Sequence, residues 1–178
     1  IKCNNKNKLN TLENILSNLE TKNTVIFCNR KKDIGSLYTD LKRRNISSII
    51  FHGDLLQSKR QEALNEFKNG NDKILIASDV AGRGIDIENI SHVINFDVPI
   101  NPEDYVHRIG RTGRAGAKGT SISLVCESDV FMLPAIEKLL GESIISTQPD
   151  EKYLLALPNA TRLRKKGTAA KRHTSHTE

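Results

Sequence analysis

The sequence predicts an α/β domain in which a mostly parallel central sheet is flanked by helices. Short apolar runs alternate with amphipathic stretches along the 178 residues, a pattern typical of repeated strand–helix units. Polar and glycine-rich segments follow several of these runs, and ligands of open α/β sheets bind at that edge. One domain with a well-buried core and a short appendage accounts for the length.

The expected elements follow from the spacing of the apolar residues. Continuous apolar runs predict five buried strands, at residues 24–28, 48–51, 73–77, 92–96 and 120–125. Apolar residues at helical spacing predict four helices, around residues 9–19, 34–41, 64–67 and 131–140. Gly70 is expected to end the third helix and Gly141 to cap the fourth. Periodicity stops near Pro158, which predicts a domain at 1–157 and a tail at 158–178.

The tail supplies most of the net charge. Residues 161–178 hold six Lys/Arg and one acid, and so contribute +5 of the formal charge of +6. Such a composition is typical of a solvated, disordered end. It also suits the binding of nucleic-acid phosphates, which attract Lys and Arg by counterion release. The two interpretations are compatible.

Several classes of protein are disfavoured by the sequence. No apolar run approaches the roughly 18 residues that a membrane span needs, and no charged region with an apolar core follows Ile1, so neither a membrane anchor nor a signal peptide is expected. The three cysteines, Cys3, Cys28 and Cys126, fit neither a disulfide framework nor a zinc site. We therefore expect no metal site and a reducing, cytoplasmic setting.

The most informative segment is 107–116. After His107, three arginines recur at every third position, at Arg108, Arg111 and Arg114, so in helical turns they would project to one side. The glycines between them let the backbone approach a ligand closely. Planar guanidinium groups suit phosphate oxygens better than Lys side chains do, so this segment predicts a phosphate-binding function.

Residues 77–87 place a hydroxyl, two carboxylates and an arginine after a predicted strand. Ser78 and nearby backbone N–H groups could hold a nucleic-acid phosphate, and Asp86 could accept hydrogen bonds from a ribose. An ordinary strand–helix loop with Asp79 capping a helix explains the same residues equally well.

A third segment, at 51–60, is weaker when it is taken alone. Gly53 follows a strand and permits close backbone approach, Asp54 comes next, and Gln57 and Arg60 lie in the first turn of the following helix. His52 is more typical of a loop histidine than of a catalyst.

In this order the segments resemble the second domain of superfamily 2 helicases, and most closely the DEAD-box RNA helicases. Residues 25–29 resemble motif IV of that family, 52–60 motif IVa, 78–86 motif V and 107–114 motif VI. The resemblance extends from about residue 24 to residue 125, and motif VI is its most specific part. It implies a RecA-like, three-layer α/β fold.

The resemblance also implies a role for each matched residue. Arg111 and Arg114 would be arginine fingers on the γ-phosphate of ATP, with His107 coupling the ATP and RNA sites. Arg108 would be braced against Phe27. The set implied for ATP is Gly84, Asp86, Arg111 and Arg114. The set implied for the RNA backbone, without base readout, is Gly53, Asp54, Gln57, Arg60, Ser78, Asp79, Gly82 and Arg83.

This chain contains no Gly-x-x-x-x-Gly-Lys-Ser/Thr phosphate loop and no Asp-Glu-Ala-Asp tetrad. The resemblance implies that an N-terminal RecA-like lobe of the same protein supplies both, and that it holds ATP and most contacts to Mg²⁺. We therefore expect the C-terminal lobe of an ATP-dependent RNA helicase, which cannot hydrolyse ATP until the two lobes close together.

Residues 133–144 and the basic tail resemble the end of the bacterial DEAD-box helicase of the RNA degradosome. That resemblance implies a role in RNA decay and an endoribonuclease as a partner. Nothing in the sequence demands more than a monomer. Two alternatives stay open, an ATP-independent RNA-binding module and an enzyme that acts on DNA, which recognition of the 2′-OH would separate from RNA.

Overall fold

A computed structural model describes residues 1–18, 23–70, 73–82, 90–113 and 118–145. Its centre is a five-stranded sheet in which every neighbouring pair is parallel, in the order β2-β3-β1-β4-β5. The strands are β1 (Thr24–Phe27), β2 (Ile49–Phe51), β3 (Ile74–Ala77), β4 (His92–Asn95) and β5 (Thr120–Ser123). All five strands expected from the apolar runs are present, and each is shorter by one or two residues.

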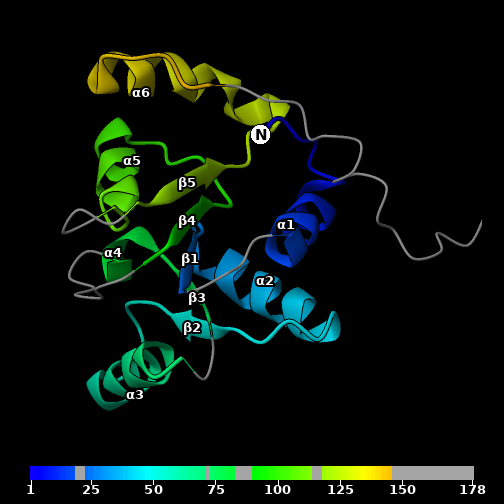
Figure 1. The fold of residues 1–178 in the computed structure, drawn as a ribbon, viewed down its shortest axis with the longest axis vertical. Helices are drawn as coiled ribbons and strands as arrows, with labels where there is room; N and C mark the ends of the chain where they lie inside the picture. The colour runs from blue at the N-terminus through cyan, green and yellow to red at the C-terminus, as the bar shows by residue number, and fades with distance from the viewer. Residues whose placement is uncertain (19–22, 71–72, 83–89, 114–117, 146–178) are drawn as a thin grey trace, which may run out of the picture.

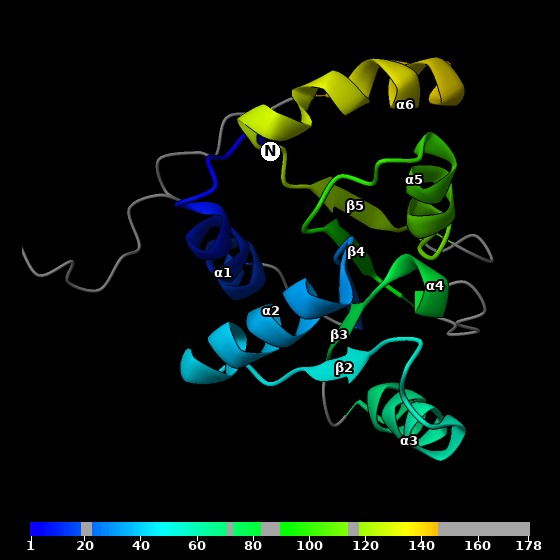
Figure 2. The ribbon, with the colours of Figure 1, turned by 180° about the vertical axis from the view of Figure 1, so that it is seen from behind.

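Helices cover both faces of this sheet. They are α1 (Lys8–Asn18), α2 (Lys31–Arg43), α3 (Gln57–Lys68), α4 (Asp79–Gly82), α5 (Pro102–Ile109) and α6 (Leu133–Leu140). Helices α1 and α2 lie on one face and α3, α4 and α5 on the other, while α6 lies beyond the edge strand β5 (Figure 1). The reverse view in Figure 2 shows the same arrangement. The α/β expectation, with a parallel sheet between two helical layers, is confirmed.

The alternation of side chains along the strands divides the core into two parts. Along β1, Val25 and Phe27 face α3 and pack in a cluster with Phe67. Ile26 faces the opposite layer and packs in a cluster with Leu12 of α1 and residues of α2. Because both faces of the sheet are buried, the strands are continuous apolar runs, which is typical of parallel sheets.

A third cluster attaches α6 beside the sheet. Ile136 of α6 is fully buried against Val98, Tyr105 and Val125. The helix begins at Leu133, two residues later than the apolar spacing suggested, because a 3-10 helix, η2 (Glu127–Met132), precedes it. Gly141 ends α6 with a φ of 75°, in the left-handed conformation expected of a capping glycine.

The start of the chain packs beside the sheet as well. Lys2 forms a parallel bridge with Val125, and the backbone N–H of Cys3 donates to the Val125 carbonyl at 2.9 Å. The expected boundary at residue 157 and the basic tail lie outside the described residues. Within the described ranges, no helix is long and apolar enough to cross a membrane.

Candidate functional site

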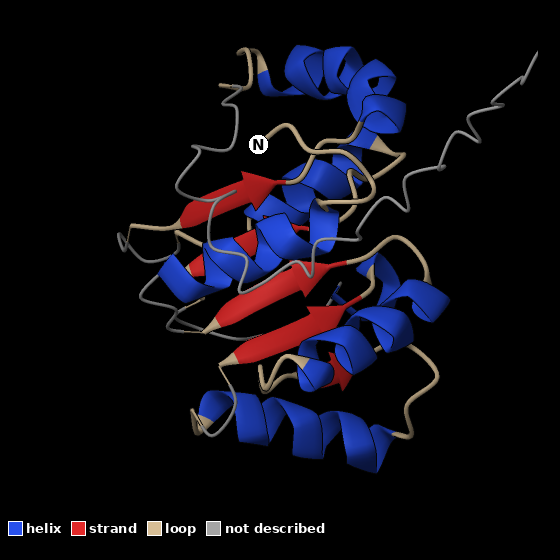
Figure 3. Ribbon diagram, turned by 90° about the vertical axis from the view of Figure 1, so that its right-hand side faces the viewer, coloured by secondary structure: helices blue, strands red, loops and turns tan. Residues whose placement is uncertain are grey.

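The carboxyl ends of β1, β3 and β4 meet at one buried side chain, that of Arg108. It projects from α5, is only 1% exposed, and lies with its guanidinium carbon 5.2 Å from the centre of the Phe27 ring. In Figure 3 the strand arrows point in one direction, which is why residues that follow different strands gather at one edge. The two residues assigned to structural coupling are therefore in contact.

Arg108 makes five hydrogen bonds, as many as a guanidinium has N–H groups. Nε donates to Asp79 Oδ1 at 2.5 Å and Nη2 to Asp79 Oδ2 at 2.7 Å, which is a bidentate ion pair. Nη2 also donates to Asn29 Oδ1 at 2.8 Å. Nη1 donates to the Asp97 carbonyl at 2.6 Å and to Asn95 Oδ1 at 3.4 Å. One side chain thus joins α5 to the segments that follow three strands.

A second layer of contacts surrounds this network. Asp97 Oδ2 accepts from the backbone N–H of Asn29 at 3.1 Å, and its Oδ1 accepts from Lys8 Nζ at 2.7 Å. Lys8 also lies 4.6 Å from the centre of the Phe96 ring. Burial alone would lower the pKa of Lys8, but its hydrogen bond and ion pair with Asp97 outweigh burial and raise this pKa. The network extends from α1 to α5.

Arg111 lies on the turn that follows α5, not on the helix itself. The helix ends at Ile109, and the backbone N–H groups of Arg111 and Thr112 donate to the carbonyls of Arg108 and Ile109, at 3.0 and 3.1 Å. Arg111 is partly exposed, and its Nε donates to the carbonyl of His107 at 3.2 Å. The expectation that the arginines project to one side of a helix is therefore wrong for Arg108 and Arg111.

His107 is on the exposed face of the last turn of α5. Its Nδ1 lies 4.0 Å from Asp104 Oδ1 in the preceding turn. Arg114 and the residues expected to contact ATP at 84 and 86 lie outside the described residues, as does Arg83. The described residues thus bring Arg108, Arg111 and His107 together on one short segment.

The residues expected to hold RNA follow β2 and β3, which are neighbours in the sheet. A Cβ placed on Gly53 would lie 3.8 Å from Cγ1 of Val80, so the segment after β2 lies against the segment after β3. Arg60 stacks its guanidinium 5.0 Å from the centre of the Phe51 ring. Asp54 is exposed and forms an ion pair with Lys31.

The remaining residues of the expected RNA set differ in exposure. Gln57 is exposed at the start of α3, Ser78 is half-buried between β3 and α4, and Gly82 ends α4. The Asp79 side chain turns inward, where both its oxygens are bound by Arg108. A contact from that carboxylate to RNA stays a prediction.

Comparison with known proteins decides the family. Residues 7–116 match the helicase conserved C-terminal domain. The chain is 44% identical over 154 residues to the ATP-dependent RNA helicase RhlB of Pseudomonas syringae, a match over 86% of this chain and 39% of that protein. It superposes on the E. coli DEAD-box protein SrmB, which is bound to the regulator of ribonuclease activity A, with a TM-score of 0.78 and 35% identity over 85% of this chain and 89% of that one. The chain is a C-terminal domain of the DEAD-box helicase family.

A solved structure with RNA bound has a similar fold to this DEAD-box domain. Dbp5 of S. cerevisiae bound to RNA and ADP BeF3 matches with a TM-score of 0.77 and 36% identity over 85% of this chain and 42% of that one. The RecA-like expectation is confirmed by these superpositions. Since the chain spans about two fifths of the length of RhlB, the activity of a whole protein belongs to the proposals below.

Sequence reasoning missed three polar residues of the DEAD-box domain that bind Arg108. Asn29, Asn95 and Asp97 complete its hydrogen bonds together with Asp79. A signal was present, because each lies at or just beyond the carboxyl end of a buried apolar run. Such a position on a parallel strand points a polar group toward the same sheet edge as its neighbours.

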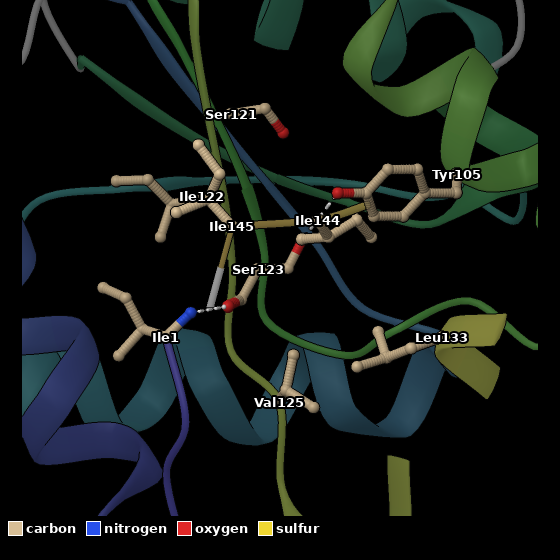
Figure 4. Close-up of a pocket in the computed structure, with 9 residues that line it drawn as sticks. All are labelled: Ile1, Tyr105, Ser121, Ile122, Ser123, Val125, Leu133, Ile144 and Ile145. Carbon is tan, nitrogen blue, oxygen red and sulfur yellow. Dashed lines mark hydrogen bonds between the residues drawn. The ribbon is translucent and has the colours of Figure 1, made fainter. Parts of the chain in front are cut away.

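One hollow of the domain lies beside this network, and another lies at the edge strand β5. One, of about 270 Å³, is lined in part by Lys8, Arg30, Asp33 and Asp97, next to the second layer of contacts. The other, of about 280 Å³, lies at the edge strand between Tyr105, Ser123 and Ile144 (Figure 4). None of the expected site residues lines it. Within the described residues, no three His, Cys, Asp or Glu side chains are grouped so as to hold a metal ion.

Proposed function

We propose that this chain is the C-terminal lobe of an ATP-dependent RNA helicase that separates short RNA duplexes or remodels RNA–protein complexes. In this function the lobe binds the RNA backbone and reaches across a cleft to ATP held by an N-terminal lobe. The observation that carries the proposal is the contrast between two neighbouring arginines. Arg108 is buried and has all its N–H groups bound inside the domain, while Arg111, one turn later, is a partly exposed residue.

Arg111 is the group that we propose to contact the γ-phosphate, together with Arg114. A guanidinium on a turn anchored by the buried Arg108 is prepositioned, so it stabilises the charge of the transition state without reorganisation. Such fingers contribute a rate factor of about 10³ to 10⁵ in phosphoryl transfer. Mg²⁺ would be bound mainly by the N-terminal lobe, and His107 would couple the two sites.

The RNA surface that we propose follows β2 and β3. Gly53 and the backbone after Ser78 allow close approach of a sugar–phosphate chain, and Gln57 and Arg60 add donors at the start of α3. Recognition of this kind is blind to base sequence. RNA is bound to Dbp5 in the matching structure, which favours RNA over DNA as the ligand here.

We further propose that the protein acts as a monomer in the cytoplasm, in RNA decay, with an endoribonuclease as a partner. The resemblance of residues 133–144 to the degradosome helicase supports the role in RNA decay, and the similarity to RhlB supports an RNA helicase. An ATP-independent RNA-binding module is the alternative, and it has no use for an arginine held toward a nucleotide.

RNA-stimulated ATP hydrolysis tests the proposal, with the chain joined to the N-terminal lobe of its protein. We expect no hydrolysis by the isolated chain and hydrolysis by the joined protein. Arg111→Ala should lower kcat by about 10³-fold while RNA affinity stays unchanged. Arg43→Ala is the matched control, because Arg43 is exposed on α2 and pairs only at 3.4 Å with Asp40. A joined protein that binds RNA without hydrolysing ATP would establish the binding-module alternative.

A further inference from the structure

A threonine hydroxyl holds the turn that carries Arg111 to the sheet. Thr112 Oγ1 donates to the carbonyl of Ile90 at 2.6 Å and lies 3.2 Å from the carbonyl of Ser91. A hydroxyl has a single proton, so the shorter contact is the main bond and the longer one a minor arm. Ile90 and Ser91 lead directly into β4. This bond therefore fixes residues 110–113, the arginine turn, against the start of a central strand.

The arginine turn is enclosed from a second side by Gly119. A Cβ placed on this glycine would lie 2.2 Å from Thr112 Oγ1 and 2.4 Å from the Gly113 nitrogen, closer than any real contact. Gly113 itself has a φ of 71°, which a glycine adopts without strain. The backbone before β5 therefore lies directly against the arginine turn, and Gly119 packs on the hydroxyl of Thr112.

Both ends of the segment that bears Arg111 are consequently anchored. Arg108 fixes the helix at the carboxyl ends of three strands, and Thr112 fixes the turn at the start of β4. Between these anchors, the Arg111 backbone has little freedom to move. A catalytic group gains most when its supporting contacts hold it in the productive geometry before the substrate arrives.

We propose that Thr112 is a positioning residue for Arg111, an inference that rests on the proposed function. Its hydroxyl does not touch ATP in this role. The hydroxyl keeps the arginine turn in the position from which the Arg111 guanidinium reaches the γ-phosphate. Loss of the hydroxyl therefore lowers the rate of hydrolysis at saturating ATP and RNA. A misplacement of about 1 Å costs on the order of 10²-fold in rate.

Three substitutions of Thr112 separate positioning from simple stability. Thr112→Ser keeps the donor and should keep the wild-type kcat. Thr112→Ala removes the bond without adding a clash, and should lower kcat by roughly 10-fold. Thr112→Val places a methyl group where the oxygen now lies 2.6 Å from a carbonyl, which forces the turn outward. Its kcat should fall further, by roughly 100-fold.

The matched control is Thr11→Ala. Thr11 is buried in α1, and its Oγ1 donates to the Asn7 carbonyl one turn earlier at 3.0 Å, so the substitution removes a buried threonine hydroxyl and its local hydrogen bond on the face of the sheet that α1 covers. We expect it to lower the melting temperature with kcat unchanged. Every variant is measured in the full-length helicase, with RNA affinity and melting temperature recorded beside kcat and KM for ATP.

The outcomes distinguish the inference from the function on which it rests. The positioning role is supported if kcat is unchanged in Thr112→Ser, lower in Thr112→Ala and lowest in Thr112→Val, with RNA affinity intact in all three. If Thr112→Ala retains the wild-type rate while Arg111→Ala is inactive, the inference is overturned and the proposed function stands. Equal loss of rate in Thr112→Ala and Thr11→Ala also overturns it, because stability alone then explains the effect. If the wild-type protein is inactive, both fail.

Discussion

Replacing Arg108 by Met should destabilise this domain more than any other substitution of a charged residue described above. Met fills much of the space of the arginine side chain, but it removes all five hydrogen bonds of the guanidinium and its contact with the Phe27 ring. Asp79 then keeps a carboxylate without its partner. The Asp97 carbonyl and the Asn29 amide oxygen lose their donors as well.

The magnitude follows from the burial of these groups. Removing one partner of a buried ion pair costs about 3–5 kcal/mol, since the other charge stays desolvated. The Asp79 side chain is 21% exposed, so water reaches part of it and the lower half of that range applies. We expect a loss of about 3–4 kcal/mol, a large share of a typical domain stability of about 5–15 kcal/mol.

Urea unfolding of the chain measures this loss as a lower midpoint at an unchanged m-value. Arg108→Lys should recover part of it, because an ammonium donates from one point and cannot bind both Asp79 oxygens. The control Arg43→Met removes an exposed arginine and should change stability by less than about 0.5 kcal/mol. If Arg108→Met cost no more than this control, the hydrogen bonds of the guanidinium would not stabilise the junction of the three strand ends.

Two further predictions follow from burial of ionisable groups. Burial lowers the pKa of His52, with the charge of Lys31 adding to the effect, and burial lowers that of His92. The unfolded chain then binds protons more readily, so stability is complete above the usual histidine pKa of about 6.5 and falls as the pH drops below it. Urea unfolding from about pH 7.5 to 5.5 should show this slope, and replacing both histidines by Asn should flatten it. Burial, and then contact with the Cys126 thiol 3.3 Å away, raise the pKa of Cys3 to about 12. Alkylation by iodoacetamide near neutral pH should therefore be much slower in the folded chain than in urea, and equal rates by mass spectrometry would contradict this.

Most of the architecture could be predicted from the sequence, because strands buried on both faces of a parallel sheet consist of continuous apolar runs. It was insufficient for α5 as a separate element, because Pro102–Ile109 is short and rich in charge. Structure explains how the helix still forms. Asn101 caps it by accepting from the backbone N–H of Glu103 at 3.1 Å, and Pro102 occupies the first turn, where no N–H is needed.

The candidate site was predictable in kind but not in detail. Residue type and order indicated which segments carry the chemistry, and the resemblance assigned Arg108 to coupling. Nothing in a three-residue spacing distinguishes an arginine that is buried from one that reaches outward. That difference arises from partners distant in sequence, as Asn29 and Asp97 show, lying 79 and 11 residues from Arg108.

The ion pair between Asp79 and Arg108 links the segment proposed to bind RNA to the segment proposed to face ATP. Asp79 follows Ser78, in the segment proposed to bind RNA, while Arg108 follows His107, in the segment proposed to face ATP. A bidentate pair resists both sliding and rotation, because either movement breaks one of its two parallel hydrogen bonds. A displacement of the segment after β3 would therefore be transmitted to α5 through this pair, and from α5 to the backbone of Arg111. A single hydrogen bond between neutral groups at this position would transmit such a displacement far less faithfully.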